Sequence, residues 1–202
     1  MSQILDTWER ILKWLEVNAP ETLETLNPGA SFAAIEEIEQ FLEVRFPEAV
    51  RDFLLRCNGQ HTKSIAVFPD YYFLLPLAEI RQNWEIEKKV LSENPALAEE
   101  VAYEEFSSIV KTGSPKVRAC YWHLKWIPVA YCLTGDLYCL DFAPTAQGQS
   151  GQVIEFWHDA DMRDLIAHSF EELLARYADD LEKGLYFYNT EADSIEKRPI
   201  GN

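Results

Sequence analysis

KWIPVAYCLTGDLYCLDFAPTAQGQSGQVIEFWH, residues 125–158, is the stretch that decides the fold. Short runs rich in aromatic and β-branched residues, separated by turn residues, occur at 117–122, 125–132, 136–142 and 152–158. Runs of this kind are typical of consecutive strands in an antiparallel sheet. The segment TAQGQSGQ, at 145–152, is predicted to be an irregular break between two of these strands.

Helical periodicity precedes this predicted sheet. Residues 3–18 place apolar side chains at the spacing of an amphipathic helix. Ser31 is a predicted N-cap, and Pro47 suits the first turn of a further helix that is expected to end at a left-handed cap on Gly59. The other elements expected before the sheet are strands at 64–68 and 71–75 and helices at 77–91 and from residue 95 onward.

A strong helical signal also follows the predicted sheet. Ser169 and Glu172 match a capping box, and the helix that they open is expected to close near Gly184. The whole pattern predicts one α+β domain: N-terminal helices, a mainly antiparallel or mixed sheet, and a C-terminal helix packed back on the sheet. We expect the domain to cover residues 1–184 and residues 185–202 to form a loosely structured tail.

Composition restricts the class of partner. The chain has 202 residues, 18 basic against 34 acidic, and a formal net charge of -16. Such a negative field repels nucleic acids and anionic membranes but speeds the encounter with a basic partner protein. No apolar run is long enough to cross a bilayer, and the first residues lack the basic stretch of a signal peptide, so a cytoplasmic location is predicted.

The cysteines predict neither a zinc site nor a disulfide framework. Cys57, Cys120, Cys132 and Cys139 form no CxxC pair and lie in apolar segments, so buried free thiols are expected. One alternative stays open: if Gly135 and Asp136 formed a two-residue turn, Cys132 and Cys139 would face each other across the hairpin and could oxidise.

One short segment contains residue types that are used in catalysis. His158, Asp159 and Asp161 lie close together in the sequence, and His168 and Ser169 follow. The segment lacks the HExxH spacing, no GxSxG elbow occurs in the chain, and the serine fits a helix cap better than a nucleophile. We therefore predict no catalytic residue, no bound metal and no cofactor.

Candidate partner-binding residues are chosen by charge and by aromatic exposure. Trp157 follows Phe156, so the two rings of a strand point to opposite faces and one of them can meet a partner beside acidic neighbours. Asp136 and Asp141 flank an apolar strand and serve either a partner or a structural hydrogen bond. The complete candidate set is Asp136, Asp141, Trp157, His158, Asp159, Asp161, Glu99, Glu100 and Glu104.

Three stretches, in this order, resemble the SUKH superfamily and in particular its Smi/Knr-like branch. They are LNPGASFAAIEEIEQFLEVRFPEAVRDFLLRCNG, YYFLLPLAEI, and IPVAYCLTGDLYCLDFAPTAQGQSGQVIEFWHD followed by SFEELL. Phe46 stands where the family usually has leucine before the proline. The resemblance implies an α+β fold and agrees with the prediction from periodicity.

The resemblance also implies a function in binding. Bacterial relatives in this superfamily are widely assigned as immunity proteins that neutralise toxins, whereas fungal relatives act as interaction hubs in cell-wall control. The first hypothesis is therefore a non-catalytic bacterial immunity protein that caps a basic toxin domain. The alternative is a regulatory scaffold of the cell-wall-assembly type. The sequence decides neither the partner nor the oligomeric state.

Overall fold

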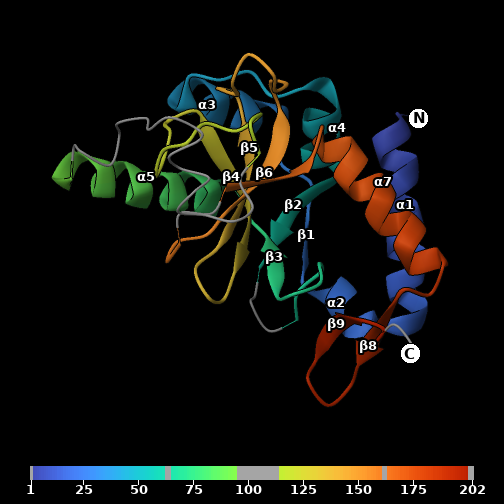
Figure 1. Ribbon diagram of the computed structural model, residues 1–202. Coiled ribbons are helices and arrows are strands. Elements are labelled where there is room, and N and C mark those ends of the chain that lie inside the picture. The colour runs from blue at the N-terminus through green and yellow to red at the C-terminus, as the bar shows by residue number, and fades with distance from the viewer. Residues whose placement is uncertain (1, 62–64, 95–113, 161–162, 200–202) are drawn as a thin grey trace.

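The computed structural model describes residues 2–61, 65–94, 114–160 and 163–199. Its central element is a five-stranded sheet in the order β3-β4-β5-β6-β7 (Figure 1). The strands are β3 Tyr72–Leu74, β4 Trp126–Cys132, β5 Leu137–Asp141, β6 Gln152–Phe156 and β7 Arg163–Ala167. Neighbouring strands all pair antiparallel. The sheet predicted from residues 125–158 is confirmed, and together with the helices it makes a single α+β domain.

Two small sheets accompany the central one. β1 Leu26–Pro28 pairs with β2 Cys57–Gln60, and β8 Tyr186–Asn189 pairs with β9 Ser194–Lys197. The helices of the described residues are α1 Gln3–Asn18, α2 Pro20–Glu24, α3 Phe32–Leu42, α4 Glu48–Arg56, α5 Leu77–Glu93 and α7 Phe170–Glu182. The helix expected from residue 95 lies outside the described residues.

Both predicted serine caps are confirmed. The Ser31 hydroxyl accepts a hydrogen bond from the Ala34 amide at 3.2 Å, and the Ser169 hydroxyl accepts one from the Glu172 amide at 3.0 Å. The Glu172 carboxylate in turn accepts from the amide of His168 at 2.9 Å. These bonds satisfy amides that have no partner within the helix, so they fix where α3 and α7 begin.

The prediction that Gly59 caps the end of a helix is wrong, although its left-handed conformation is confirmed. α4 ends at Arg56, and Gly59 lies in β2, although its φ of +69° is indeed left-handed. A Cβ atom at Gly59 would approach the backbone nitrogen of Pro76 to 2.3 Å. Glycine is therefore required by the close approach of two backbone segments rather than by a helix end.

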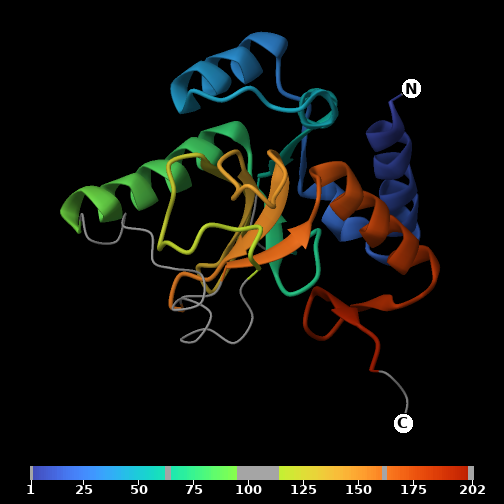
Figure 2. The same ribbon diagram turned by 45° about the horizontal axis from the view of Figure 1, so that its top comes forward.

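Helices enclose the sheet from two sides. Figures 1 and 2 show α1 and α7 side by side, with α5 on the opposite side of the sheet. Arg10 of α1 forms ion pairs with Asp179 at 2.6 Å and Glu182 at 2.5 Å on α7. The predicted helix that packs back on the sheet is confirmed, because α7 contacts β6 and β7.

The strands of the structure differ from the predicted ones in two ways. Residues 65–68 and 117–122 form no strand, while β1, β2, β7, β8 and β9 were not predicted. The segment before β4 lies over the sheet, and the Trp122 ring contacts the rings of Trp126 and Phe156 at centroid distances of 5.8 and 5.0 Å. Aromatic side chains favour strands because strands are half-buried, and a segment that covers a sheet gives them the same burial.

The expected loose tail also differs from the structure. Residues 185–199 contain the β8–β9 hairpin, in which the Ile195 side chain is buried. The ring of Tyr186 lies 5.8 Å from that of Tyr177 on α7. The amide of Leu185 donates to the Asp180 carbonyl oxygen at 2.9 Å, which ties the hairpin to the end of α7.

The cysteines are free and buried, as expected. The alternative in which Cys132 faces Cys139 is wrong, because Cys139 pairs with Pro128. The loop between β4 and β5 is longer than two residues, and the ladder shifts between Pro128 and Ala130. A shift of one residue moves a side chain to the other face of a sheet, so turn length alone does not give the register.

Candidate protein-binding surfaces

The structure brings together three of the predicted site residues. Asp136, in the loop between β4 and β5, accepts hydrogen bonds from the His158 amide at 3.1 Å and from the His158 ring Nδ1 at 3.0 Å. The Thr134 hydroxyl donates to the same carboxylate at 2.8 Å. Burial alone would raise the pKa of Asp136, but the hydrogen bonds from His158 and Thr134 outweigh it and lower the pKa.

Gly135 makes this arrangement possible. Its φ of +109° is a conformation that L side chains rarely adopt, and a Cβ atom there would lie 2.9 Å from the His158 ring. The imidazole therefore packs against the bare backbone of the loop. One ligand atom each from Asp136, His158 and Asp159 lies within 4.8 Å of the others, a spacing that suits a metal ion. The hydrogen bonds to Asp136 already give its carboxylate a structural role, so we assign no metal here.

Two exposed apolar side chains lie near this end of the sheet. Leu133, in the same loop, is 55% exposed, and Tyr71, which directly precedes β3, is 42% exposed. The pairing of Tyr72 with Cys132 puts both at the same end of the sheet. We define the hairpin-end patch as Tyr71, Leu133, Asp136, His158 and Asp159. Its mixture of apolar and charged groups is typical of protein interfaces, and its role in binding stays a prediction.

Trp157 is placed as its alternation with Phe156 predicts. Phe156 is fully buried in the core, and Trp157 is half-buried directly after β6. The carbonyl oxygens of Trp157 and Ala160 accept hydrogen bonds from the buried guanidinium of Arg163 at 3.0 and 2.8 Å. Arg163 therefore holds the chain that carries His158 and Asp159, a contribution that the sequence did not reveal.

The prediction that Asp141 contacts a partner is wrong. Its side chain is fully buried and accepts hydrogen bonds from the Trp126 indole at 3.0 Å, the Ala143 amide at 2.8 Å and the Gln152 amide group at 2.9 Å. Burial raises the pKa of Asp141, although these hydrogen bonds oppose the rise. The carboxylate is a structural group, and the alternative of a structural hydrogen bond applies.

Four predicted residues are not placed. Asp161, Glu99, Glu100 and Glu104 lie outside the described residues. The constellation of His158 with His168 and Ser169 is not supported as a reactive site, because the Ser169 hydroxyl caps α7. Burial raises the pKa of the Cys57 thiol to about 11. Burial also raises the pKa of the Cys139 thiol, so neither thiol is activated as a nucleophile.

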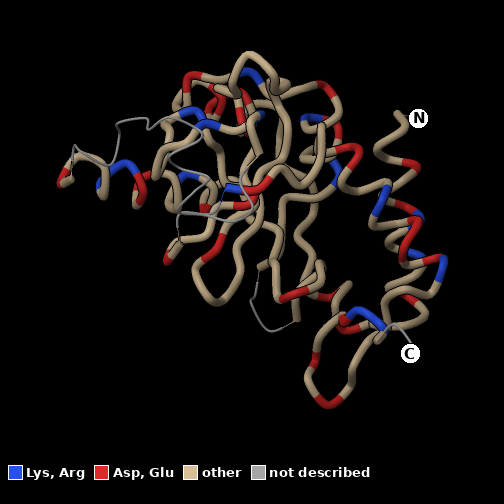
Figure 3. Tube along the Cα trace, viewed as in Figure 1, with Lys and Arg blue, Asp and Glu red and all other residues tan. Residues whose placement is uncertain are grey.

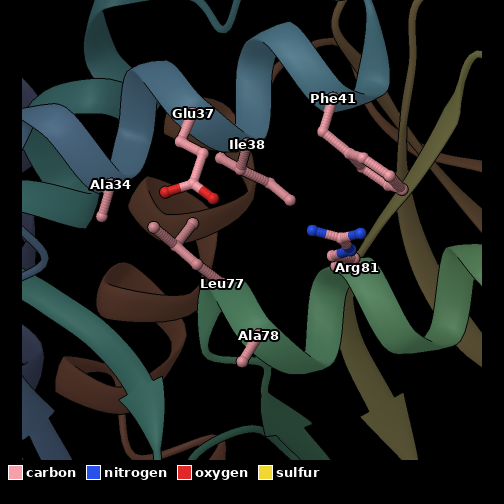
Figure 4. Close-up of a pocket in the computed structure, with 7 residues that line it drawn as sticks. All are labelled: Ala34, Glu37, Ile38, Phe41, Leu77, Ala78 and Arg81. Carbon is pink, nitrogen blue, oxygen red and sulfur yellow. The ribbon is translucent and has the colours of Figure 1, made fainter.

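A second surface was not predicted. A groove of about 280 Å³ opens between α3 and α5 (Figure 4). We define the α3–α5 groove by its lining residues Ala34, Glu37, Ile38, Phe41, Leu77, Ala78 and Arg81. Figure 4 shows the carboxylate of Glu37 on the α3 wall and the guanidinium of Arg81 on the α5 wall, with apolar side chains between them.

The two charged walls differ in how they are held. The Arg81 guanidinium carbon lies 3.9 Å from the centre of the Phe41 ring, and its Nε donates to Glu85 at 3.1 Å. Glu37 is exposed and has no hydrogen bond or ion pair to a residue that the structure describes. The groove thus offers an apolar floor, a fixed cation and a free anion. The sequence shows the helical spacing of residues 34, 38 and 41, but not that α5 lies opposite.

Comparison with known proteins gives consistent matches. Residues 29–176 match the family described as SMI1 / KNR4 family (SUKH-1). The chain is 30% identical over 195 residues to the "Cell wall biosynthesis/cell cycle regulator smi1" of Schizosaccharomyces pombe, with 95% of this chain and 39% of the relative covered. It is 27% identical to a "Glucan synthesis regulatory protein" of Neurospora crassa, with 96% and 41% covered.

A third relative has a similar description. The "Cell wall assembly regulator SMI1" of Saccharomyces cerevisiae is 25% identical, with 93% of this chain and 42% of the relative covered. The chain therefore spans about two fifths of the length of these relatives. None of the helices in the described part of the chain has the length and apolar character needed to cross a membrane.

Proposed function

The chain belongs to the SMI1/KNR4 family (SUKH-1), and from this premise we propose that it is a non-catalytic protein-binding domain of a regulatory protein. The relatives described above are fungal and carry the names of regulators of cell-wall assembly and glucan synthesis. These names support the regulatory scaffold over the bacterial immunity protein, which had been the first hypothesis from sequence. The proposed role is to hold a partner protein in cell-wall control.

The α3–α5 groove is the observation that carries this proposal. Its floor is apolar, and its walls present opposite charges from Glu37 and Arg81. A partner segment fits it when an apolar side chain enters the groove with a basic group toward Glu37 and an acidic group toward Arg81. The free carboxylate of Glu37 gains an ion pair in such a complex.

Further features support a non-catalytic binding role and a cytoplasmic location. The thiols of Cys57 and Cys139 are buried with raised pKa values, and the Ser169 hydroxyl is used as a helix cap. Four free cysteines suit a reducing compartment. The formal net charge of -16 favours a partner that is basic as a whole.

Filling the groove tests the proposal. Ala78 is exposed on α5 and lines the groove, whereas Ala33 is exposed on α3 and does not line it. In affinity capture from lysate of the protein's own host, followed by mass spectrometry, Ala78→Trp should reduce recovery of the main partner at least tenfold. Ala33→Trp should leave recovery unchanged, since the added ring lies outside the groove.

Circular dichroism shows whether both variants keep the fold. Equal capture of one partner by wild type and Ala78→Trp would remove the groove from the proposal. The binding role itself fails in two cases. In the first, no surface substitution changes the recovery of any captured protein. In the second, the purified protein turns over a substrate.

A further inference from the structure

A pocket lined by aromatic rings lies between the sheet, α7 and the C-terminal hairpin. It encloses about 120 Å³. We define the tyrosine pocket by six of its lining residues, the aromatic Phe68, Tyr138, Tyr177 and Tyr186 and the acidic Asp70 and Asp180. These residues come from the segment before β3, from β5, from α7 and from β8, so only the folded chain assembles them.

The rings are held in fixed positions. The Tyr177 ring contacts Phe68 edge-on at 5.4 Å between centroids and Tyr186 at 5.8 Å. The Tyr177 hydroxyl donates to the Val67 carbonyl oxygen at 2.8 Å. Tyr72 stacks on one face of Tyr138 at 3.9 Å, so a ligand meets the opposite face or the ring edge. The pocket is therefore preformed rather than assembled on binding.

The backbone that carries the two acids is held by hydrogen bonds. Asp70 has a left-handed φ of 58°, and its carbonyl oxygen accepts a hydrogen bond from the Cys132 thiol at 3.2 Å. Asp180 is tied to the start of the hairpin because its carbonyl oxygen accepts from the Leu185 amide at 2.9 Å. The main chain at both acids is thus held at the wall of the pocket.

The electrostatic balance of the pocket is negative. Burial raises the pKa of Tyr186, the negative charges of Asp180 and Asp70 raise it further, and Arg176 opposes them. Arg176 also lines the pocket, but it donates to the Ile166 carbonyl oxygen at 2.8 Å and lies 3.8 Å from the Glu172 carboxylate. Its charge is thus shared with Glu172, while two carboxylates remain for a ligand.

The size of the pocket limits the ligand. A volume of about 120 Å³ is well below the roughly 300 to 1,000 Å³ of pockets that take drug-sized molecules. The pocket accommodates the end of one side chain, and aromatic faces with adjacent carboxylates attract an organic cation.

We propose that the tyrosine pocket binds the ammonium or guanidinium end of a lysine or arginine side chain on a partner protein. This proposal depends on the proposed binding function in one respect: the cation that enters the pocket belongs to a partner protein. The pocket is separate from the α3–α5 groove, because the two share no lining residue. It gives the acidic chain a specific point of contact with a basic partner.

Single blocked amino acids test the pocket without a partner. Titration of the labelled full chain with N-acetyl-lysine methylamide, followed by NMR, should shift the amide signals of Tyr186 and Asp180 with millimolar affinity. The norleucine analogue has the same alkyl chain without the ammonium group and should cause no such shifts. The arginine analogue should bind like the lysine analogue, and choline, which represents a small free cation, should bind more weakly.

Variants give the sign of each contribution. Tyr186→Ala and the conservative Asp180→Asn should each weaken the lysine probe about fivefold or more. Arg176→Gln should strengthen it, because a like charge is removed from the pocket. Tyr188→Ala, in the same hairpin but outside the pocket, and Ala78→Trp, in the α3–α5 groove, should leave the affinity unchanged.

Three results would overturn the assignment. They are equal binding of the lysine and norleucine probes, weaker binding in Arg176→Gln, or tighter binding of choline than of either amino-acid probe. Failure of the probes to bind would reject the pocket but leave the proposed function intact. Conversely, loss of partner capture in Ala78→Trp does not affect the probe experiment.

Discussion

Asp141 stabilises the junction of three segments from inside the core. Its carboxylate accepts hydrogen bonds from Trp126 on β4, from Gln152 on β6 and from the Ala143 amide directly after β5. All three donors are directed at one buried charge, so the arrangement fixes both the strands and the chain that leaves them. A buried donor without a partner costs about 1 to 3 kcal/mol, which makes this site sensitive to single-atom changes.

The first prediction concerns the replacement of one carboxylate oxygen. Asp141→Asn should lower the free energy of unfolding by about 1 to 3 kcal/mol, because the new amide group faces the Gln152 amide group. Gln152 is unable to turn over, since its oxygen accepts from the Gln149 amide at 3.0 Å and its nitrogen donates to Lys116 at 3.0 Å. Urea unfolding measures the change.

Asp159→Asn is the matched control for this measurement. Asp159 is exposed, so the same chemical change should alter the free energy of unfolding by less than about 0.5 kcal/mol. Equal effects of the two substitutions would mean that the hydrogen bonds to Asp141 contribute nothing specific.

The second prediction concerns pH and Glu155. Burial raises the pKa of Glu155, Asp164 and Asp136 add to the rise, and a hydrogen bond from the Tyr72 hydroxyl at 2.6 Å opposes it. The folded state therefore binds this proton more tightly than the unfolded state does. The stabilisation is present at low pH and is lost as the pH rises through the raised folded value.

Glu155→Gln should remove this pH dependence. Between pH 5 and 7, the free energy of unfolding of the wild type relative to Glu155→Gln should fall as the pH rises. Tyr72→Phe removes a hydrogen bond that favours the carboxylate, so the fall should be larger in total and extend to higher pH in that variant. Urea unfolding at several pH values gives the differences, and parallel curves for all three proteins would contradict the assignment of Glu155.

At the scale of the elements, short sequence patterns predicted the features that depend only on neighbouring residues in the sequence. The caps at Ser31 and Ser169 are visible in four consecutive residues. The strand β7 was missed because its register positions mix Arg163 and Asp164 with apolar residues. The buried guanidinium of Arg163 donates to the nearby carbonyl oxygen of Trp157 and to the distant one of Tyr121, and the apolar and polar pattern of β7 does not reveal these partners.

The candidate surfaces were predictable to different degrees. Asp136 and His158 were chosen from sequence, Asp136 beside an apolar strand and His158 next to Trp157. The pairing of β5, which follows Asp136, with β6, which precedes His158, brings the two together. The α3–α5 groove depends on two helices whose lining residues are separated by about 40 positions, such as Ile38 and Leu77. Periodicity gives the apolar side of each helix but not its partner, so contacts of this kind require the structure.

The third prediction concerns the C-terminal hairpin. Ile195 of β9 is 1% exposed, so truncation leaves a cavity in the core that the hairpin helps to close. Ile195→Ala should lower the free energy of unfolding by about 2 to 5 kcal/mol. Leu185→Ala is the control, since Leu185 precedes the same hairpin and is 43% exposed. Denaturant unfolding measures both variants. Equal free energies of unfolding would support the original prediction that residues 185–202 form a loose tail.

At the scale of the whole molecule, the charge is spread rather than local. Figure 3 shows Asp and Glu along helices, turns and the C-terminal hairpin, with Lys and Arg interspersed. Some acids are compensated, as at the ion pairs of Arg10 with α7. With a formal net charge of -16, many others are not, so folding brings like charges together and lowers the stability of the compact state.

The fourth prediction follows from this self-repulsion. Raising NaCl from 10 to 150 mM shortens the Debye length from about 30 Å to about 8 Å, which screens repulsion across the molecule more than contacts between adjacent groups. The midpoint of thermal unfolding should therefore rise by several degrees.

A double variant with less negative charge should respond less to salt. Glu16→Lys and Glu24→Lys, both at exposed positions, together change the formal net charge from -16 to -12, so the salt-induced rise of the midpoint should be smaller. Lys13→Glu, which increases the negative charge, should show a larger rise. A midpoint that falls with salt in all three proteins would mean that close ion pairs such as Arg10 with Asp179 outweigh the long-range repulsion.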